Sequence, residues 1–239
     1  MEGLILRSLG GFYTVISEDG TRTECRGRGI FRKDQTTLLV GDRCTFEPTE
    51  PGCGSITAIA PRKNTLQRPP VANLDRLALV ISLADPAPNA TVIDQLTAIA
   101  ARREIPVVVI FTKPDLADPA PWVEIYRKAG YPTAVVNNLT GEGLETASLL
   151  LRGGITAFCG NSGAGKSSLM NGLYPDLKLA TGEISKKLGR GRHTTRHVEL
   201  FPAGHGGPKW SGIKTAAATP AAATAPSRAA PCWRRYGRG

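Results

Sequence analysis

The sequence lacks several features that define large classes of protein. None of its hydrophobic runs is long enough to cross a membrane, and its first residues lack a basic segment followed by an apolar core. Five cysteines occur, without a Cys-x-x-Cys pair or a histidine at metal-ligand spacing: Cys25, Cys44, Cys53, Cys159 and Cys232. These absences argue against a membrane protein, a secreted disulfide-bonded domain and a zinc protein. We therefore expect a cytoplasmic protein with reduced thiols, no zinc ligands and no membrane partner.

Acidic residues are scarce, above all toward the end of the chain. The 239 residues include 30 Lys and Arg against 20 Asp and Glu, a formal net charge of +10. Residues 203–239 contain no Asp or Glu, are rich in Ala, Pro, Gly, Thr and Arg, and show no hydrophobic period, which predicts a disordered tail. The positive charge of the remaining chain is consistent with a polyanionic partner such as nucleic acid, and equally with a surface that only keeps the protein soluble.

Residues 1–61 consist of short stretches of alternating hydrophobic and polar residues, broken by Gly and Asp. This pattern predicts a small barrel of about five strands, of the OB-fold type. Basic residues gather in one connection of the segment: Arg26, Arg28, Arg32 and Lys33. A basic loop on an OB-fold can hold RNA phosphates, and a solvated loop without a partner explains the same pattern. Both interpretations are open.

A basic stretch that contains prolines, residues 62–76, separates this segment from a different pattern. Within residues 77–202, apolar runs (77–83, in which only Ser82 is polar, and 107–111) alternate with segments of helical period such as 91–103. Such runs are typical of strands buried on both faces of a parallel sheet. Residues 77–202 therefore predict an α/β domain with a doubly wound sheet, in which ligands bind at the carboxyl ends of the strands.

A glycine-rich loop lies between the apolar run at residues 155–159 and a helical segment, and it matches the Walker A pattern. Glycines let backbone N–H groups turn toward an anion, and the start of the following helix adds its positive end. We expect Lys166 to reach the β- and γ-phosphates and the Ser167 hydroxyl to ligate Mg²⁺. Phosphate contacts are predicted for Gly160, Asn161, Ser162, Gly163, Ala164, Gly165, Lys166, Ser167 and Ser168.

The element that reads the base follows the predicted strand at residues 107–111. In GTPases an Asn/Thr-Lys-x-Asp element at a strand end selects guanine, because the Asp carboxylate accepts two N–H groups that adenine cannot offer. Here Thr112 stands where Asn is commoner; it keeps a hydroxyl and loses the amide. We predict guanine binding by Thr112, Lys113, Pro114 and Asp115.

A further loop of GTPases touches the base through its backbone and usually contains Ser-Ala. This chain has Asn137-Asn138 at that place, directly after the predicted strand at residues 133–136. The chain order is also inverted, because Asp115 precedes Lys166, whereas an ordinary small GTPase begins with the phosphate loop. A circular permutation explains this order, since the same strands can still lie side by side.

These features together resemble one family. The small barrel, the connector at residues 68–75, the permuted motifs and the Gly-Arg-His-Thr-Thr of residues 191–195 are similar to the RsgA (YjeQ) GTPases over residues 1 to about 202. The resemblance implies an OB-fold barrel followed by a circularly permuted P-loop GTPase domain. It also implies a monomer that binds GTP and GDP, hydrolyses GTP with Mg²⁺, and assists late maturation of the 30S small ribosomal subunit by contacting 16S rRNA.

The resemblance further implies a first switch at residues 189–195. Thr194 or Thr195 would close on Mg²⁺ and the γ-phosphate while GTP is intact. His193 matches a histidine proposed to assist hydrolysis in the family, and an exposed residue that contacts RNA is the other interpretation.

The chain departs from the family pattern after residues 198–202. Family members continue into an Asp-x-Pro-Gly motif and a helical region with zinc ligands, whereas this chain contains no Asp-x-x-Gly. Without that strand, we expect residues 198–201 to have no strand partner and the strand before the phosphate loop to be an exposed edge. We interpret the ending as a truncation or frameshift, so the family zinc is not expected. Two rival hypotheses are a remnant that only binds RNA or nucleotide, and an unrelated P-loop kinase, against which Thr112 to Asp115 argue.

Overall fold

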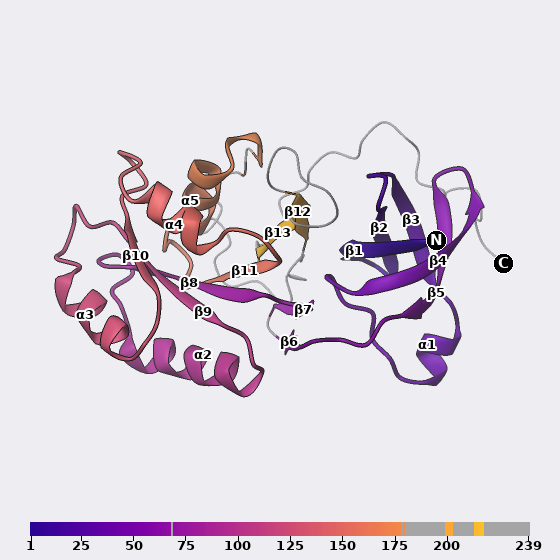
Figure 1. Cartoon of the computed structure of the whole chain (residues 1–239), viewed down its shortest axis with the longest axis horizontal. Helices are drawn as coiled ribbons and strands as arrows, with labels where there is room; N and C mark the ends of the chain where they lie inside the picture. The colour runs from indigo at the N-terminus through magenta and orange to yellow at the C-terminus, as the bar shows by residue number, and fades with distance from the viewer. Residues whose placement is uncertain (68, 178, 180–198, 203–212, 218–239) are drawn as a thin grey trace.

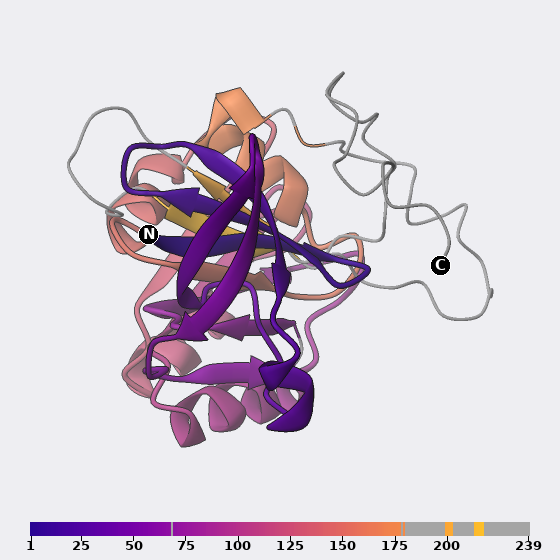
Figure 2. The same cartoon turned by 90° about the vertical axis from the view of Figure 1, so that its right-hand side faces the viewer.

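The computed structural model describes residues 1–67, 69–177, 179, 199–202 and 213–217, and of residues 32, 33, 202 and 213–217 the backbone only. Within this part of the chain a β-barrel lies beside an α/β sheet (Figure 1). The view along the long axis looks onto the barrel, with the sheet and its helices behind it (Figure 2). Among the described helices, none is both long and apolar enough to span a membrane.

The barrel is closed in the strand order β1-β2-β3-β5-β4, which confirms the predicted OB-fold. Pairing of β1 with β4 closes it, and a short helix lies between β3 and β4. Alternation builds its core: along β4, Cys44 and Phe46 are buried and the residues between them are exposed. The elements are β1 (Glu2–Leu9), β2 (Phe12–Ser17), β3 (Arg22–Gly27), α1 (Ile30–Lys33), β4 (Arg43–Glu50) and β5 (Cys53–Ile59).

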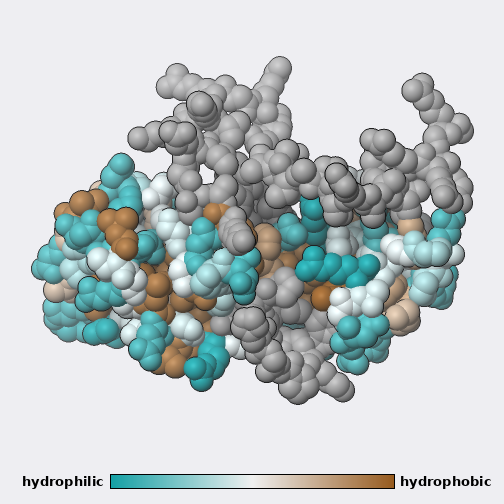
Figure 3. Space-filling view, turned by 90° about the horizontal axis from the view of Figure 1, so that it is seen from above, coloured by the Kyte–Doolittle hydropathy of each residue, from teal (hydrophilic) through white to brown (hydrophobic). Residues whose placement is uncertain are grey.

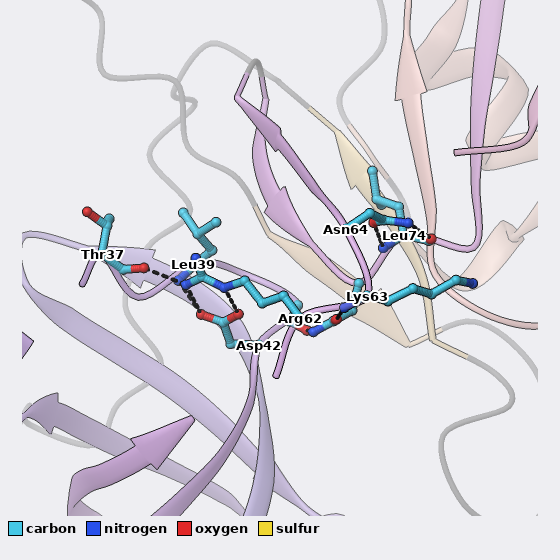
Figure 4. Close-up of polar contacts among 9 residues, drawn as sticks. Thr37, Leu39, Asp42, Arg62, Lys63, Asn64 and Leu74 are labelled. Atoms are coloured by element: carbon cyan, nitrogen blue, oxygen red, sulfur yellow. Dashed lines mark hydrogen bonds and ion pairs between the residues drawn. The ribbon is translucent and has the colours of Figure 1, made fainter. Parts of the chain in front are cut away.

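Polar contacts hold the chain that leaves the barrel (Figure 4). The Arg62 guanidinium donates to both carboxylate oxygens of Asp42, at 2.7 and 2.8 Å, and to the Thr37 carbonyl. Asn64 then pairs with the backbone of Leu74 through two hydrogen bonds of 2.9 Å. The connector thus contains a small antiparallel hairpin, β6 (Thr65–Gln67) and β7 (Pro70–Ala72), instead of an extended linker.

The second sheet has six strands in the order β10-β9-β8-β11-β13-β12. β8 to β11 run parallel, β13 is parallel to β11, and β12 is antiparallel to β13. The elements are β8 (Arg76–Ser82), α2 (Ala90–Arg102), β9 (Val107–Thr112), α3 (Ala120–Lys128), β10 (Thr133–Val136), α4 (Leu144–Leu150), β11 (Thr156–Cys159), α5 (Lys166–Leu173), η1 (Pro175–Leu177), β12 (Leu200–Pro202) and β13 (Ile213–Ala217).

Both faces of this sheet are covered, as the apolar runs predicted. Leu79 of β8 and Phe111 of β9 share one buried cluster with residues of α2 and α3. Val80 of β8 shares a second cluster with Leu169 of α5 and with residues of α4. Helices α2 and α3 accordingly lie on one side of the sheet and α4 and α5 on the other (Figure 1). The predicted doubly wound architecture is confirmed.

The prediction for the far edge of the sheet was wrong. The strand before the phosphate loop is not an exposed edge, because β13 pairs with it at Ala157↔Ala216 and Phe158↔Ala217. The strand that contains Phe201 has a partner as well, at Phe201↔Lys214. Strand pairing uses backbone N–H and C=O groups, so a stretch whose composition builds no core can still fill a strand position. The rest of the predicted tail, residues 203–212 and 218–239, lies outside the described residues.

The surface of the two parts differs in character. Seen from above, the hydrophobic residues that are not covered gather mainly over the α/β part, and the barrel presents mostly hydrophilic residues (Figure 3).

Candidate functional site

The parallel sheet brings the sequence motifs to one edge. β8 lies between β9 and β11, so the carboxyl ends of these three strands are neighbours. The Thr112–Asp115 element follows β9, and the phosphate loop of residues 160–165 follows β11. The circular permutation changes the order of these motifs along the chain and leaves them adjacent in space.

The phosphate loop is fixed by glycines at its two ends. A Cβ at Gly160 would lie 2.1 Å from the Val80 carbonyl oxygen, so only glycine lets the loop leave β11 against β8. Gly165, at φ +81°, caps helix α5 and, having no side chain, gives the first N–H groups of that helix no acceptor of its own. Unsatisfied N–H groups at the start of a helix are a ready site for an anion.

Lys166 is folded over its own loop. Its ammonium group donates to the carbonyl oxygens of Gly160, at 2.9 Å, and Asn161, at 2.7 Å. Burial lowers the pKa of Lys166 below its ordinary value, and only the nearby Cys159 acts in the opposite direction. A bound phosphate would provide the compensating negative charge that this half-buried ammonium lacks.

The predicted base-reading element contacts the phosphate loop directly. Thr112 is fully buried, and its hydroxyl donates to the Ala164 carbonyl at 2.8 Å. Lys113 adopts φ +61° and donates its ammonium group to the Asp85 carbonyl, in the loop that follows β8. The Asp115 side chain belongs to an exposed residue, where an incoming base can reach it. The described structure thus brings Thr112 and the phosphate loop together.

Sequence reasoning missed one side chain of this site. Asn138, after β10, donates its amide to the Gly165 carbonyl at 3.3 Å, although only the backbone of its loop was expected to matter. The signal was present in the sequence, because Asn138 stands where the usual loop has a small residue without polar side-chain atoms.

The site suits a metal ion that is coordinated mainly by phosphate oxygens and water and by few protein side chains. Ser167 lies in the first turn of α5 and is half-buried. In the described residues no group of three or more His, Cys, Asp or Glu side chains could hold a metal by itself. Mg²⁺ usually takes only one or two protein ligands beside phosphates and water, so Ser167 in this position fits such an ion.

The predicted switch residues His193, Thr194 and Thr195 lie outside the described residues, within the stretch 180–198; description ends before it at Leu179 and resumes at Glu199. Before them, the Asn171 side chain of α5 exchanges two hydrogen bonds of 2.8 Å with the backbone of Leu179. After them, Glu199 forms an antiparallel bridge with Arg7 of barrel strand β1. The described chain that ends at Leu179 thus contacts the phosphate-loop helix, and the described chain that begins at Glu199 contacts the barrel.

Part of the basic connection of the barrel is engaged within the protein. The Arg26 guanidinium stacks over the Phe12 ring, 4.4 Å from its centroid, and Arg28 pairs with Glu47 at 2.5 Å. The side chains of Arg32 and Lys33 are outside the described part. A second basic group lines a hollow of about 300 Å³ between the connector and the end of α2, formed by Arg62, Lys63, Asn64, Thr65, Arg102, Arg103 and Glu104.

The cysteines agree with the expectation of thiols. No disulfide joins the four described cysteines. Cys159 directly precedes the phosphate loop, and burial raises its pKa to about 11, so its thiol is protonated at neutral pH.

Comparison with known proteins gives one consistent result. The family model "RsgA N-terminal domain" matches residues 2–56, and "RsgA GTPase" matches residues 59–208. The small ribosomal subunit biogenesis GTPase RsgA of Geobacillus kaustophilus is 44% identical over 211 residues, which cover 86% of this chain and 72% of that protein. The protein of the same name from Moorella thermoacetica is 43% identical over 209 residues, with 87% and 72% covered.

Solved structures agree. YjeQ from Thermotoga maritima superposes with a TM-score of 0.69 at 30% identity, covering 90% of this chain and 74% of that one. YloQ, described as a circularly permuted GTPase, gives a TM-score of 0.66 at 30% identity, with 89% and 69% covered. These values extend the likeness over both the barrel and the sheet.

Proposed function

The chain belongs to the RsgA GTPase family, and from this we propose that it binds GTP, hydrolyses it to GDP and phosphate, and acts in biogenesis of the small ribosomal subunit. The observation that carries the proposal is the contact of Thr112 with the phosphate loop, which joins a base-reading element to a phosphate site. The names of the relatives favour this function over a remnant that only binds RNA or nucleotide.

The proposed roles follow the motifs. The N–H groups of residues 160–168 and the Lys166 ammonium bind the phosphates, while Asp115 accepts from the guanine edge beside Lys113. Ser167 is the protein ligand of Mg²⁺, and Mg²⁺ when bound neutralises charge on the β- and γ-phosphate oxygens. In the proposed arrangement Thr194 or Thr195 completes the site around the γ-phosphate and His193 positions the attacking water.

The proposed domain division supports these roles. Residues 1–61 form an RNA-binding OB-fold, residues 62–76 a basic linker and residues 77–202 the GTPase domain, to whose sheet β13 also belongs. The polyanionic partner is the 30S subunit and its 16S rRNA, met by a monomer in the cytoplasm. The basic hollow beside α2 supports an RNA partner, because Arg102 and Arg103 lie there together.

Nucleotide titration tests the proposal. We expect titration calorimetry of the full chain to detect GTP and GDP but not ATP, and Asp115→Asn to shift preference from GTP toward XTP, because the amide cannot accept both N–H groups of guanine. The matched control Asp118→Asn changes an acidic residue three positions later and should keep GTP selectivity. Equal binding of ATP and GTP, or none of either, contradicts the proposal.

Salt dependence tests the RNA partner. If Arg102 and Arg103 contact phosphates, replacing both with Gln should weaken binding to 16S rRNA and reduce the slope of log K against log salt by about 1 to 2. Lys128→Gln, on the exposed side of α3 and outside the hollow, removes one positive charge and serves as the control for each arginine replaced singly. An unchanged slope would remove this hollow from the RNA-binding surface.

A further inference from the structure

Two side chains from different loops hold consecutive carbonyl groups of the phosphate loop. Thr112, which ends β9, donates its hydroxyl to the Ala164 carbonyl at 2.8 Å. Asn138, which follows β10, donates its amide to the Gly165 carbonyl at 3.3 Å. These carbonyls belong to the two residues directly before Lys166, so the contacts fix the backbone from which helix α5 and the lysine begin.

Two side chains are needed here, because the Thr112 hydroxyl does not donate to both the Ala164 and the Gly165 carbonyl. A threonine hydroxyl has a single proton, and at Thr112 it is directed to Ala164 and, at 3.4 Å, to the Ile81 carbonyl. A side-chain amide carries two N–H donors, and the Thr112 side chain has no amide. We propose that Asn138 supplies this missing amide from the neighbouring loop and so acts as a positioning residue for the phosphate loop. The inference rests on the proposed nucleotide site and adds a residue to it.

Packing around the amide supports an evolved contact. A Cβ at Gly165 would lie 2.7 Å from the Asn138 amide nitrogen but 3.7 Å, an ordinary contact distance, from the Thr112 hydroxyl, so glycine at this position makes room for the Asn138 donor. The amide oxygen of Asn138 is buried and has no hydrogen-bond partner among the described residues. A buried acceptor without a donor is unfavourable, so an asparagine with no use for its N–H groups would be less stable here than an alanine.

The neighbouring asparagine provides a matched comparison. Asn137 directs its side-chain oxygen into its own loop, where it accepts from the backbone of Leu139 at 2.9 Å and Thr140 at 3.4 Å. Asn137 therefore stabilises an ordinary turn, whereas Asn138 reaches across to another loop. Replacing either asparagine with alanine removes the same amide group. Only the change at Asn138 also removes a contact with the phosphate loop.

The test uses the full chain and four variants: Asn138→Ala, Asn137→Ala, and each of these combined with Thr112→Asn. We expect Asn138→Ala to raise the Kd of GTP and of GDP by the same factor, about tenfold for one lost hydrogen bond. Thr112→Asn, which restores an amide beside the same carbonyls, should bring the Kd back to within about threefold of the parent. In the Asn137→Ala background, where the Asn138 contact is intact, Thr112→Asn should not lower the Kd. A Kd within twofold of the parent for Asn138→Ala, or failure of the rescue, overturns the proposal.

A second measurement does not depend on nucleotide. In the nucleotide-free protein, Asn138→Ala should speed amide hydrogen exchange at Leu169, whose N–H donates to the same Gly165 carbonyl, and Thr112→Asn should slow it again. If the parent does not bind GTP, the proposed function fails while this exchange still tests the contact. Exchange equal to that of the parent in Asn138→Ala overturns the contact even if GTP binds.

Discussion

At the scale of single residues, Lys166 is the side chain whose environment changes most if a phosphate binds. Its ammonium group donates hydrogen bonds to two carbonyl oxygens of the loop, and burial lowers its pKa. Phosphate oxygens would favour the charged form and raise that pKa again. Binding and protonation of Lys166 are therefore linked.

This linkage has a definite sign. Because bound phosphate raises the pKa of Lys166, GTP binding should take up protons, and affinity should fall as pH rises through the lowered pKa of the free protein. Without nucleotide, the unfolded chain is the better proton binder, so the contribution of Lys166 to stability grows as pH rises from that lowered pKa to the ordinary value. Titration calorimetry at pH 7 and 9, each in two buffers of different ionisation enthalpy, measures the uptake.

Lys166→Arg is the control for this prediction. Its guanidinium stays charged at all these pH values, so any remaining binding should proceed without proton uptake. Uptake that persists in this variant would assign the proton to another group and contradict the linkage.

At the scale of elements, the strands, helices and loops near the site were predictable and the far edge of the sheet was not. Residues 77–81 and 107–111 are apolar throughout, which favours a strand covered on both faces, and glycines at 160 and 165 mark the turn that follows such a strand. Two things left no such signal. The sequence of β13 carries no hydrophobic alternation, and the reach of Asn138 to Gly165 depends on how two loops meet in three dimensions.

Strand β13 yields a prediction of its own. Proline at Ala216 removes a backbone N–H at the residue that pairs with both Ala157 and Leu200, so Ala216→Pro should detach β13 and expose the edge of β11. We expect a loss of about 3 kcal/mol in unfolding free energy and a rise in light scattering on heating. Ala216→Ser keeps the N–H and should stay close to the parent. Equal behaviour of both variants would contradict the pairing.

At the scale of the whole molecule, the connector fastens the barrel to the sheet. The Asp42 side chain is fully buried and that of Arg62 is 23% exposed, so their ion pair is largely shielded from water. The Arg28–Glu47 pair on the barrel, at 52% and 59%, is its exposed counterpart. Removing one partner of a buried pair leaves an uncompensated charge, whereas an exposed pair contributes little.

We therefore expect Asp42→Asn to lower the unfolding free energy by about 3 kcal/mol and Glu47→Gln by less than about 1 kcal/mol, as measured by urea unfolding. Because the Asp42–Arg62 contact joins the barrel to the connector, Asp42→Asn should also separate the unfolding of the barrel from that of the sheet. Equal effects of the two substitutions would show that the buried pair does not fasten the two parts.

The pairing of β13 also bears on how such a chain can change during evolution. The ladder that joins β13 to β11 is formed by main-chain groups, which every residue except proline supplies. A sheet position of this kind can accept a stretch as plain as Ile-Lys-Thr-Ala-Ala without any matching of side chains. Selection on mutations in this strand acts on backbone geometry and hardly on the chemistry of the side chains. The far edge of the sheet can therefore drift in sequence while the motifs at the nucleotide-binding edge cannot.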